Sequence, residues 1–284
     1  MKIPLKKLKK AIKAAIKDRA LRFTGLEIKA EYITTAPSAQ SALDVFNGEW
    51  TAKLPFPFQD LRAGDAGVFQ DPRIAWLGEQ LDGAGSMRVL ECGPHEGGHT
   101  YMLEKLGVAS ILSIEANTHA FLRCLVLKEL LELKRSRFML GDFVSYLRNS
   151  NHFDLVVASG VLYHLVNPVE AIALMSKVTD RLYIWSHYYD ETKVKAHPLL
   201  ARHFQSSSPA EYDGFKHSLY RQHYQTRLGN PGFNGGSEHY SHWLSREDLI
   251  ESLGFFGFNN ITIHFDHPDE SIGPSISLLA IRTL

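Results

Sequence analysis

Val89-Leu90-Glu91-Cys92-Gly93-Pro94-His95-Glu96-Gly97-Gly98-His99-Thr100 is the stretch that decides the fold, and Ile111-Leu112-Ser113-Ile114-Glu115 follows it closely. The first stretch predicts an apolar strand that enters a glycine-rich turn and then a helix. The second predicts another strand, which ends on an acid. Glycine lets a backbone approach a ligand that a Cβ atom would hold away, and the acid is placed to accept hydrogen bonds from ribose hydroxyls. Together they predict a nucleoside-containing ligand at the edge of a parallel sheet.

The spacing of the glycines narrows the choice of ligand. A dinucleotide site has the pattern Gly-x-Gly-x-x-Gly, whereas His95 stands here in place of the second glycine. The Gly-Lys-Ser/Thr ending of a phosphate loop is also missing. A ligand without phosphates fits better, and S-adenosylmethionine is the one expected.

This region resembles the class I S-adenosylmethionine-dependent methyltransferases, and the resemblance continues along the chain. Phe138 to Phe143, with Gly141-Asp142 at the turn, resembles the third strand of that family and the acid that contacts adenine. Residues 153–165 resemble the fourth strand and its loop, and Asn167-Pro168 then begins a helix. The resemblance covers residues 86–188 strongly and the C-terminal strands weakly. It implies a Rossmann-like α/β fold with a mostly parallel seven-stranded sheet and helices on both faces.

The resemblance also implies a set of cofactor-binding residues in the turns that follow the strands. Two of them have another interpretation, because Glu115 could end its strand in solvent and Asp142 could cap a helix that begins near Phe143. The full set is Glu91, Gly93, His95, Gly97, Thr100, Glu115, Ala116, Asp142, Phe143 and Ser159.

Composition is that of an ordinary enzyme. The 284 residues include 31 Lys and Arg against 31 Asp and Glu, so no net charge favours nucleic acid as a partner. The chain has only two cysteines, which argues against a disulfide framework and favours a reducing, cytoplasmic location. No apolar run has the length of a membrane span.

The N-terminus is strongly basic. Residues 1–22 carry seven lysines and two arginines, and Leu5, Leu8, Ile12 and Ile16 recur at helical spacing. Such an amphipathic helix could pack on the domain with its lysines in water, lie on an anionic membrane, or contact RNA phosphates. The oligomeric state is not indicated by any pattern.

Strands and helices are expected to alternate from residue 88 onward, which indicates a parallel sheet. Residues 1–85 form a helical and aromatic N-terminal extension in this interpretation, and residues 86–284 form the methyltransferase domain. A polar, aromatic stretch at about 188–243 breaks the alternation and is interpreted as an insertion without regular structure over the carboxyl-terminal edge of the sheet, which acts as a lid or as a substrate-recognition element. The strands are expected at 88–92, 110–115, 137–140, 154–158, 181–187, 261–265 and 275–281, the last two antiparallel, and the helices at 98–106, 118–133, 168–178 and from the Ser245 cap to about 253.

Histidines at the ends of strands are the candidates for catalysis, because methyl transfer to an oxygen usually needs a base. His187 is the first choice, since it follows strand five and opens the insertion. His164 is the second, and the Tyr163-His164 pair resembles one that lines the pocket in this superfamily. His267 follows Asp266, which could orient its ring. Each could instead be a hydrogen-bonded histidine in the wall of an aromatic pocket.

A metal site is weighed and not predicted. His239 and His242 could share a helical face at i and i+3, with Glu238 and His223 nearby. This spacing matches no strong zinc signature.

The acceptor is the least determined part of the function. The aromatic, histidine-rich insertion favours a small molecule, such as a sugar or natural-product hydroxyl. Gly160-Val161-Leu162-Tyr163-His164 also resembles the loop of enzymes that carboxymethylate the wobble uridine of tRNA, although Leu165-Val166 follow where that family has basic residues. The remaining alternative is a non-catalytic scaffold that retains the fold.

Overall fold

The computed structural model describes residues 32–224, 235–270 and 272–283. The chain divides into two compact units, Met1–Val45 and Phe46–Leu284, so residues 46–85 belong to the same unit as the sheet. In the first unit, helix α2 (Ala39–Leu43) begins after Ser38, whose hydroxyl accepts a hydrogen bond from the Ser41 N–H. The predicted basic helix over residues 1–22 lies outside the described residues. None of the described helices is long and apolar enough to cross a bilayer.

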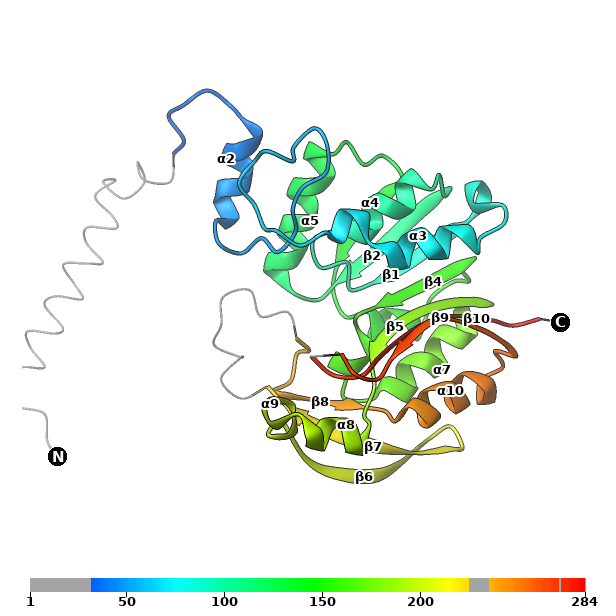
Figure 1. The fold of residues 1–284 in the computed structure, drawn as a ribbon. Coiled ribbons are helices and arrows are strands. Elements are labelled where there is room, and N and C mark those ends of the chain that lie inside the picture. Colours follow the sequence, from blue (N-terminus) through cyan, green and yellow to red (C-terminus); the bar gives the residue numbers. More distant parts are fainter. Residues whose placement is uncertain (1–31, 225–234, 271, 284) are drawn as a thin grey trace, which may run out of the picture. The chain divides into compact units, whose positions relative to one another are not determined.

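The second unit is built on a seven-stranded sheet (Figure 1). Its strands lie in the order β3-β2-β1-β4-β5-β10-β9. Strands β1 to β5 are parallel, whereas β10 is antiparallel to both β5 and β9. The predicted mostly parallel sheet and its antiparallel final pair are therefore confirmed. The strands are β1 (Arg88–Cys92), β2 (Ser110–Glu115), β3 (Ser136–Leu140), β4 (Leu155–Ser159), β5 (Arg181–His187), β9 (Asn260–His267) and β10 (Ser275–Ile281).

The helices begin where the sequence supplies capping residues. Asp71, Asn117, Asp142 and Ser245 each accept a backbone N–H with the side chain at a helix start. The helix expected over 118–133 ends early, because Glu132 adopts a left-handed φ of 51°. The helices are α3 (Pro72–Glu79), α4 (Gly98–Lys105), α5 (Thr118–Leu130), α6 (Phe143–Leu147), α7 (Pro168–Val178) and α10 (Arg246–Phe255).

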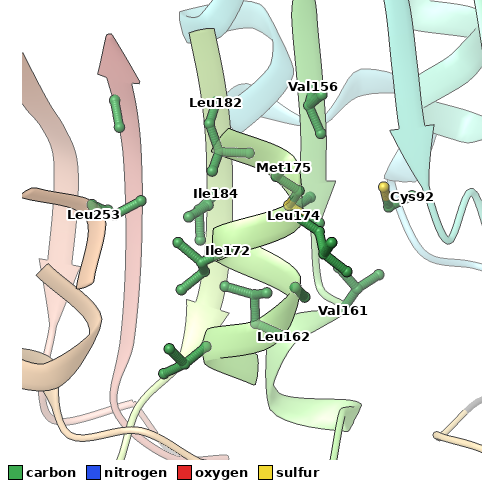
Figure 2. Close-up of a cluster of buried hydrophobic side chains, with 14 of the residues drawn as sticks. Cys92, Val156, Val161, Leu162, Ile172, Leu174, Met175, Leu182, Ile184 and Leu253 are labelled. Atoms are coloured by element: carbon green, nitrogen blue, oxygen red, sulfur yellow. The ribbon is translucent and has the colours of Figure 1, made fainter. Parts of the chain in front are cut away.

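Apolar side chains cover both faces of the sheet, as a parallel sheet requires. On one face, α6, α7 and α10 pack on alternate residues of the strands, and Figure 2 shows Ile172 and Met175 of α7 beside Leu182 and Ile184 of β5. On the other face, α3 and α4 pack on the intervening residues, such as Tyr183. The crevice at the carboxyl ends of β1, β2 and β4, where the strand order reverses, is the expected ligand site.

The insertion after β5 is not structureless, and that prediction was wrong. It contains helices α8 (Glu191–Ala196) and α9 (Pro198–Ala201) and a three-stranded antiparallel sheet. The sheet consists of β6 (Phe204–Tyr212), β7 (Phe215–His223) and β8 (Tyr240–Trp243). The hairpin between β6 and β7 turns at Asp213-Gly214, both of which have positive φ. Asp-Gly is a strong hairpin signal, and it was the available clue in the sequence.

The suggestion that His239 and His242 share a helical face is also wrong, because His242 lies on strand β8. Because successive side chains of a strand point to opposite faces, residues at i and i+3 do not share one. His242 Nδ1 instead lies 2.7 Å from the Val166 carbonyl oxygen. Among the described residues, no group of three His, Cys, Asp or Glu side chains could hold a metal ion.

Candidate active site

The turn after β1 depends on backbone conformations that glycine favours. Gly93 has a φ of +68°, and a Cβ atom added to it would lie 2.6 Å from Val161 Cγ1. Gly97 has a φ of +78° and packs on the ring of Phe138. His95 is not a glycine but also has a positive φ, of 58°. Such a conformation persists only where its surroundings enforce it.

Glu115 provides that enforcement from the end of β2. Its Oε2 accepts the His95 N–H at 3.0 Å, and its Oε1 accepts the Asn117 N–H at 2.8 Å. The residue is 8% exposed, so the alternative that it ends a strand in solvent is wrong. Burial raises the pKa of Glu115, although the backbone hydrogen bonds oppose this. Each oxygen still has a lone pair for a further donor.

Glu91 lies buried at the end of β1. The hydroxyls of Thr100 and Ser113 both donate to its Oε2, the latter at 2.7 Å. Its Oε1 is buried and has no hydrogen-bond partner among the described residues. Burial raises the pKa of Glu91. A buried carboxylate oxygen of this kind needs a donor, which a bound ligand could supply.

A cavity of about 400 Å³, here called the first cavity, opens at the crevice beside this turn. Ten residues were predicted to bind a cofactor, and Glu91, Gly97 and Thr100 do not line it. The other seven do: Gly93, His95, Glu115, Ala116, Asp142, Phe143 and Ser159.

The structure shows the hydrogen bonding of two lining residues, Asp142 and Ser159, which the sequence could not decide. Asp142 does cap α6, because its oxygens accept the N–H groups of Val144 and Ser145 at 3.1 and 3.0 Å. It nevertheless faces the cavity, so the two interpretations are compatible. The Ser159 Oγ is buried and has no partner in the described part of the chain.

Sequence reasoning missed an Asp–Arg–His cluster at the same cavity. Arg73 Nε donates to both oxygens of Asp71, at 2.9 and 3.0 Å, and His99 Nε2 lies 2.8 Å from Asp71 Oδ2. Burial alone would raise the pKa of Asp71, but the hydrogen bonds from His99 and Arg73 outweigh it and hold that pKa well below its usual range. Arg73 and His99 line the first cavity. Asp71-Pro72 was readable as a helix start, whereas nothing in the sequence connected Arg73 with His99.

A second cavity, of about 380 Å³, adjoins the first and shares Tyr163 and His164 with it. Most of its wall comes from the insertion. None of the described side chains that line it is Lys, Arg, Asp or Glu. The lining residues are Tyr163, His164, His187, His197, Leu200, His203, Gln222, Tyr224, Trp243 and Ile272.

Of these two cavities, His187 lines only the second. Its Nδ1 lies 3.0 and 3.1 Å from the carbonyl oxygens of Gly273 and Pro274, so this nitrogen carries the proton in the neutral ring and Nε2 is left as the acceptor. Its ring stacks on Trp243, with centroids 5.1 Å apart. Burial lowers the pKa of His187, and the two carbonyl groups oppose that shift.

Tyr163 and His164 form the wall between the cavities, within a 3-10 turn at Leu162–His164. His164 Nδ1 lies 3.1 Å from the Tyr224 hydroxyl. Burial lowers the pKa of His164 to about 4, with a smaller contribution from His187. Burial also raises the pKa of Tyr163 above its usual range. His164 is therefore a much weaker base than an ordinary histidine.

The third histidine candidate lies elsewhere. His267 is exposed at the end of β9 and lines neither cavity. Asp266 does not orient it, because its carboxylate accepts the Tyr188 hydroxyl at 2.8 Å and pairs with Arg246. A larger, open cavity of about 560 Å³ is lined by Tyr188, Arg246 and Asp266, and no residue of the glycine turn lines it.

The fold is shared with solved methyltransferase structures. The N-terminal domain of EvdMO1, solved with SAH bound, is 20% identical over 86% of this chain and 95% of that domain, with a TM-score of 0.68. The same domain in the presence of SAH and D-fucose gives 21% identity and a TM-score of 0.67. Magnesium protoporphyrin IX methyltransferase (ChlM) from Synechocystis PCC 6803, with bound SAH, is 16% identical over 87% of this chain and all of that one, with a TM-score of 0.53.

At these identities the comparisons establish architecture. The chain has the class I methyltransferase fold, as the sequence predicted. No protein-family model matches the sequence, and no curated protein matches it.

Proposed function

We propose that this chain is an S-adenosylmethionine-dependent methyltransferase that modifies a hydroxyl group of an uncharged small molecule, such as a sugar or natural product. The observation that carries the proposal is the pair of adjoining cavities with Tyr163 and His164 as their common wall. One cavity has the acids that a nucleoside needs, and the other has the polar and aromatic wall that suits a neutral acceptor.

The residues of the first cavity fit the cofactor. Glu115 is held by two backbone N–H groups and still offers lone pairs to ribose hydroxyls. Gly93 lines the cavity, and a Cβ atom at this position would collide with Val161. When bound, the cofactor would supply a methyl group on an already activated sulfonium.

The chain's own task is then to position the acceptor and remove its proton. Holding the reacting atoms in line and excluding water supplies most of the rate in such a displacement. His187 is the proposed base, because its Nδ1 proton is fixed on backbone carbonyl groups and Nε2 is left to accept. His164 is the weaker candidate, since its pKa is lowered to about 4.

The second cavity favours a neutral acceptor over nucleic acid. A phosphate-rich substrate is usually held by Lys and Arg, and the described lining of this cavity has neither. The EvdMO1 domain was solved in the presence of D-fucose, which is consistent with a sugar-sized acceptor. Four imidazoles with Gln222 and Tyr224 could hydrogen-bond several hydroxyl groups.

Calorimetric titration tests the proposal. S-adenosylmethionine and S-adenosylhomocysteine should bind with micromolar affinity, and Glu115→Ala should weaken both by at least about tenfold, because it removes a charged acceptor of two hydroxyls. Glu251→Ala, on an exposed position of α10, is the control and should leave both affinities unchanged. If well-folded protein binds neither ligand, the proposed function is wrong. A carboxylated relative of S-adenosylmethionine, which the wobble-uridine enzymes with a similar loop use, would then be titrated. Failure to bind that ligand as well would leave the non-catalytic scaffold as the remaining hypothesis.

A further inference from the structure

Arg73 contributes a positive charge to the first cavity. Of the described residues that line this cavity, it is the only lysine or arginine. Glu115 ends β2 and Asp142 lies in the turn after β3, whereas Arg73 lies over the indole of Trp185, on β5. These two acids therefore lie toward one edge of the sheet and the cation toward the other, and the insertion adds a third acid, Glu238, to the lining.

The Arg73 guanidinium is fixed before any ligand arrives. Its Nε and Nη2 atoms bond Asp71, and its carbon lies 4.1 Å from the centroid of the Trp185 ring. Asp71 is itself held by His99. A side chain held in this way loses little conformational entropy when it binds a further partner.

One edge of the Arg73 guanidinium can still donate hydrogen bonds to a ligand. Nη1 of Arg73 makes no hydrogen bond to any residue in the described ranges, although Nε and Nη2 both do. A planar guanidinium offers five donors in a fixed geometry that suits a carboxylate. The natural partner of this edge is therefore an anion inside the first cavity.

We propose that Arg73 binds the α-carboxylate at the amino-acid end of the cofactor, an inference that rests on the proposed function. S-adenosylmethionine carries no phosphate, so that carboxylate is its single anionic group. The ribose and adenine are assigned to Glu115 and Asp142, at the other edge of the cavity. Arg73 is a positioning residue in this assignment, because fixing the amino-acid end directs the sulfonium toward Tyr163.

The test compares two ligands that differ in the amino-acid end. S-adenosylhomocysteine has the carboxylate, and 5′-methylthioadenosine lacks it, so both are titrated into each protein. Arg73→Gln should weaken S-adenosylhomocysteine by about 10- to 100-fold, the usual size of a lost charged hydrogen bond, and 5′-methylthioadenosine by less than about twofold. Arg137→Gln, at an exposed position of β3, is the control and should change neither affinity.

Removing Arg73 alone takes away a cation that pairs with the buried Asp71 carboxylate, which could destabilise the fold. A second variant therefore removes both charges. It combines Asp71→Asn with Arg73→Gln, and asparagine still caps α3. The double variant should show the same selective loss. Each protein is checked by its melting temperature without ligand.

Three results would overturn the assignment. Equal losses for both ligands would mean that Arg73 only shapes the cavity, and no loss for either would mean that it binds nothing there. A loss confined to a carboxylated form of the cofactor would place the anion on the transferred group. Failure of the unmodified protein to bind S-adenosylhomocysteine would instead count against the proposed function itself.

Discussion

The rings of Tyr163 and His187 meet edge to face, with their centroids 4.7 Å apart and their planes at 74°. Tyr163 belongs to the loop after β4 and lines both cavities, whereas His187 ends β5 and lines only the second. The contact joins the proposed cofactor site to the proposed base. A substrate in the second cavity would reach both residues.

Replacing His187 with alanine should lower turnover by about 100-fold or more, the usual contribution of a general base. Cofactor affinity should stay within about twofold, because His187 does not line the first cavity. Turnover is measured as release of S-adenosylhomocysteine with an acceptor found in a panel of neutral sugars and glycosides. His267→Ala, exposed on β9, is the matched control. Unchanged turnover in His187→Ala would remove this residue as the base.

The partly buried His164 should make the protein less stable in acid. Its pKa is about 4 in the folded chain and about 6.5 in the unfolded chain. Above both values neither state is protonated, and the residue has no effect. As the pH falls from about 6.5 to 4, only the unfolded state takes up the proton, so the free energy of unfolding decreases, by roughly 2 kcal/mol at about pH 5.

Urea unfolding at about pH 7 and pH 5 measures this effect. His164→Gln should reduce the loss of stability between the two pH values by roughly 2 kcal/mol, whereas His267→Gln should lose as much as the unmodified protein. Other groups also titrate over this range, so the difference between the two variants is the quantity that decides. Equal losses in both variants would contradict the assigned pKa.

Arg123 should be a strong contributor to stability. Its side chain is fully buried on α5, donates to the Glu49 carbonyl oxygen at 2.6 Å, and lies 3.9 Å from Glu96 Oε1. Glu96 in turn accepts the backbone N–H groups of Thr51 and Ala52. Arg123→Met should lower the free energy of unfolding by about 3–5 kcal/mol, because it leaves the Glu96 charge buried without its counterion.

Denaturant unfolding of single and double variants checks that explanation. Glu96→Gln combined with Arg123→Met should recover part of the loss, since no unpaired charge then remains. Arg137→Met, at an exposed site, should change stability by less than about 0.5 kcal/mol. A loss below about 1 kcal/mol in Arg123→Met would show that the ion pair matters little.

Local sequence signals were sufficient for the main sheet. The strand at 88–92 and the helix at 168–178 were predicted with the observed bounds, because apolar runs, caps and Pro168 act within a few residues. The antiparallel final pair came from family resemblance. The strands of the insertion were not predicted because they are polar on one face. Even the buried face of β7, with Phe215, His217 and Leu219, includes a histidine, so its alternation of apolar and polar residues is weak.

The sequence by itself determined the glycine turn, the acid at the end of β2 and the positions of the main-sheet strands along the chain, since these depend on backbone conformation and short-range pattern. Only the tertiary structure decided which side chains meet. Arg73 and His99 bond the same Asp71 although 26 residues separate them, and His164 and Tyr224 come together across 60 positions. Such pairings arise from packing between elements, and no local pattern specifies them.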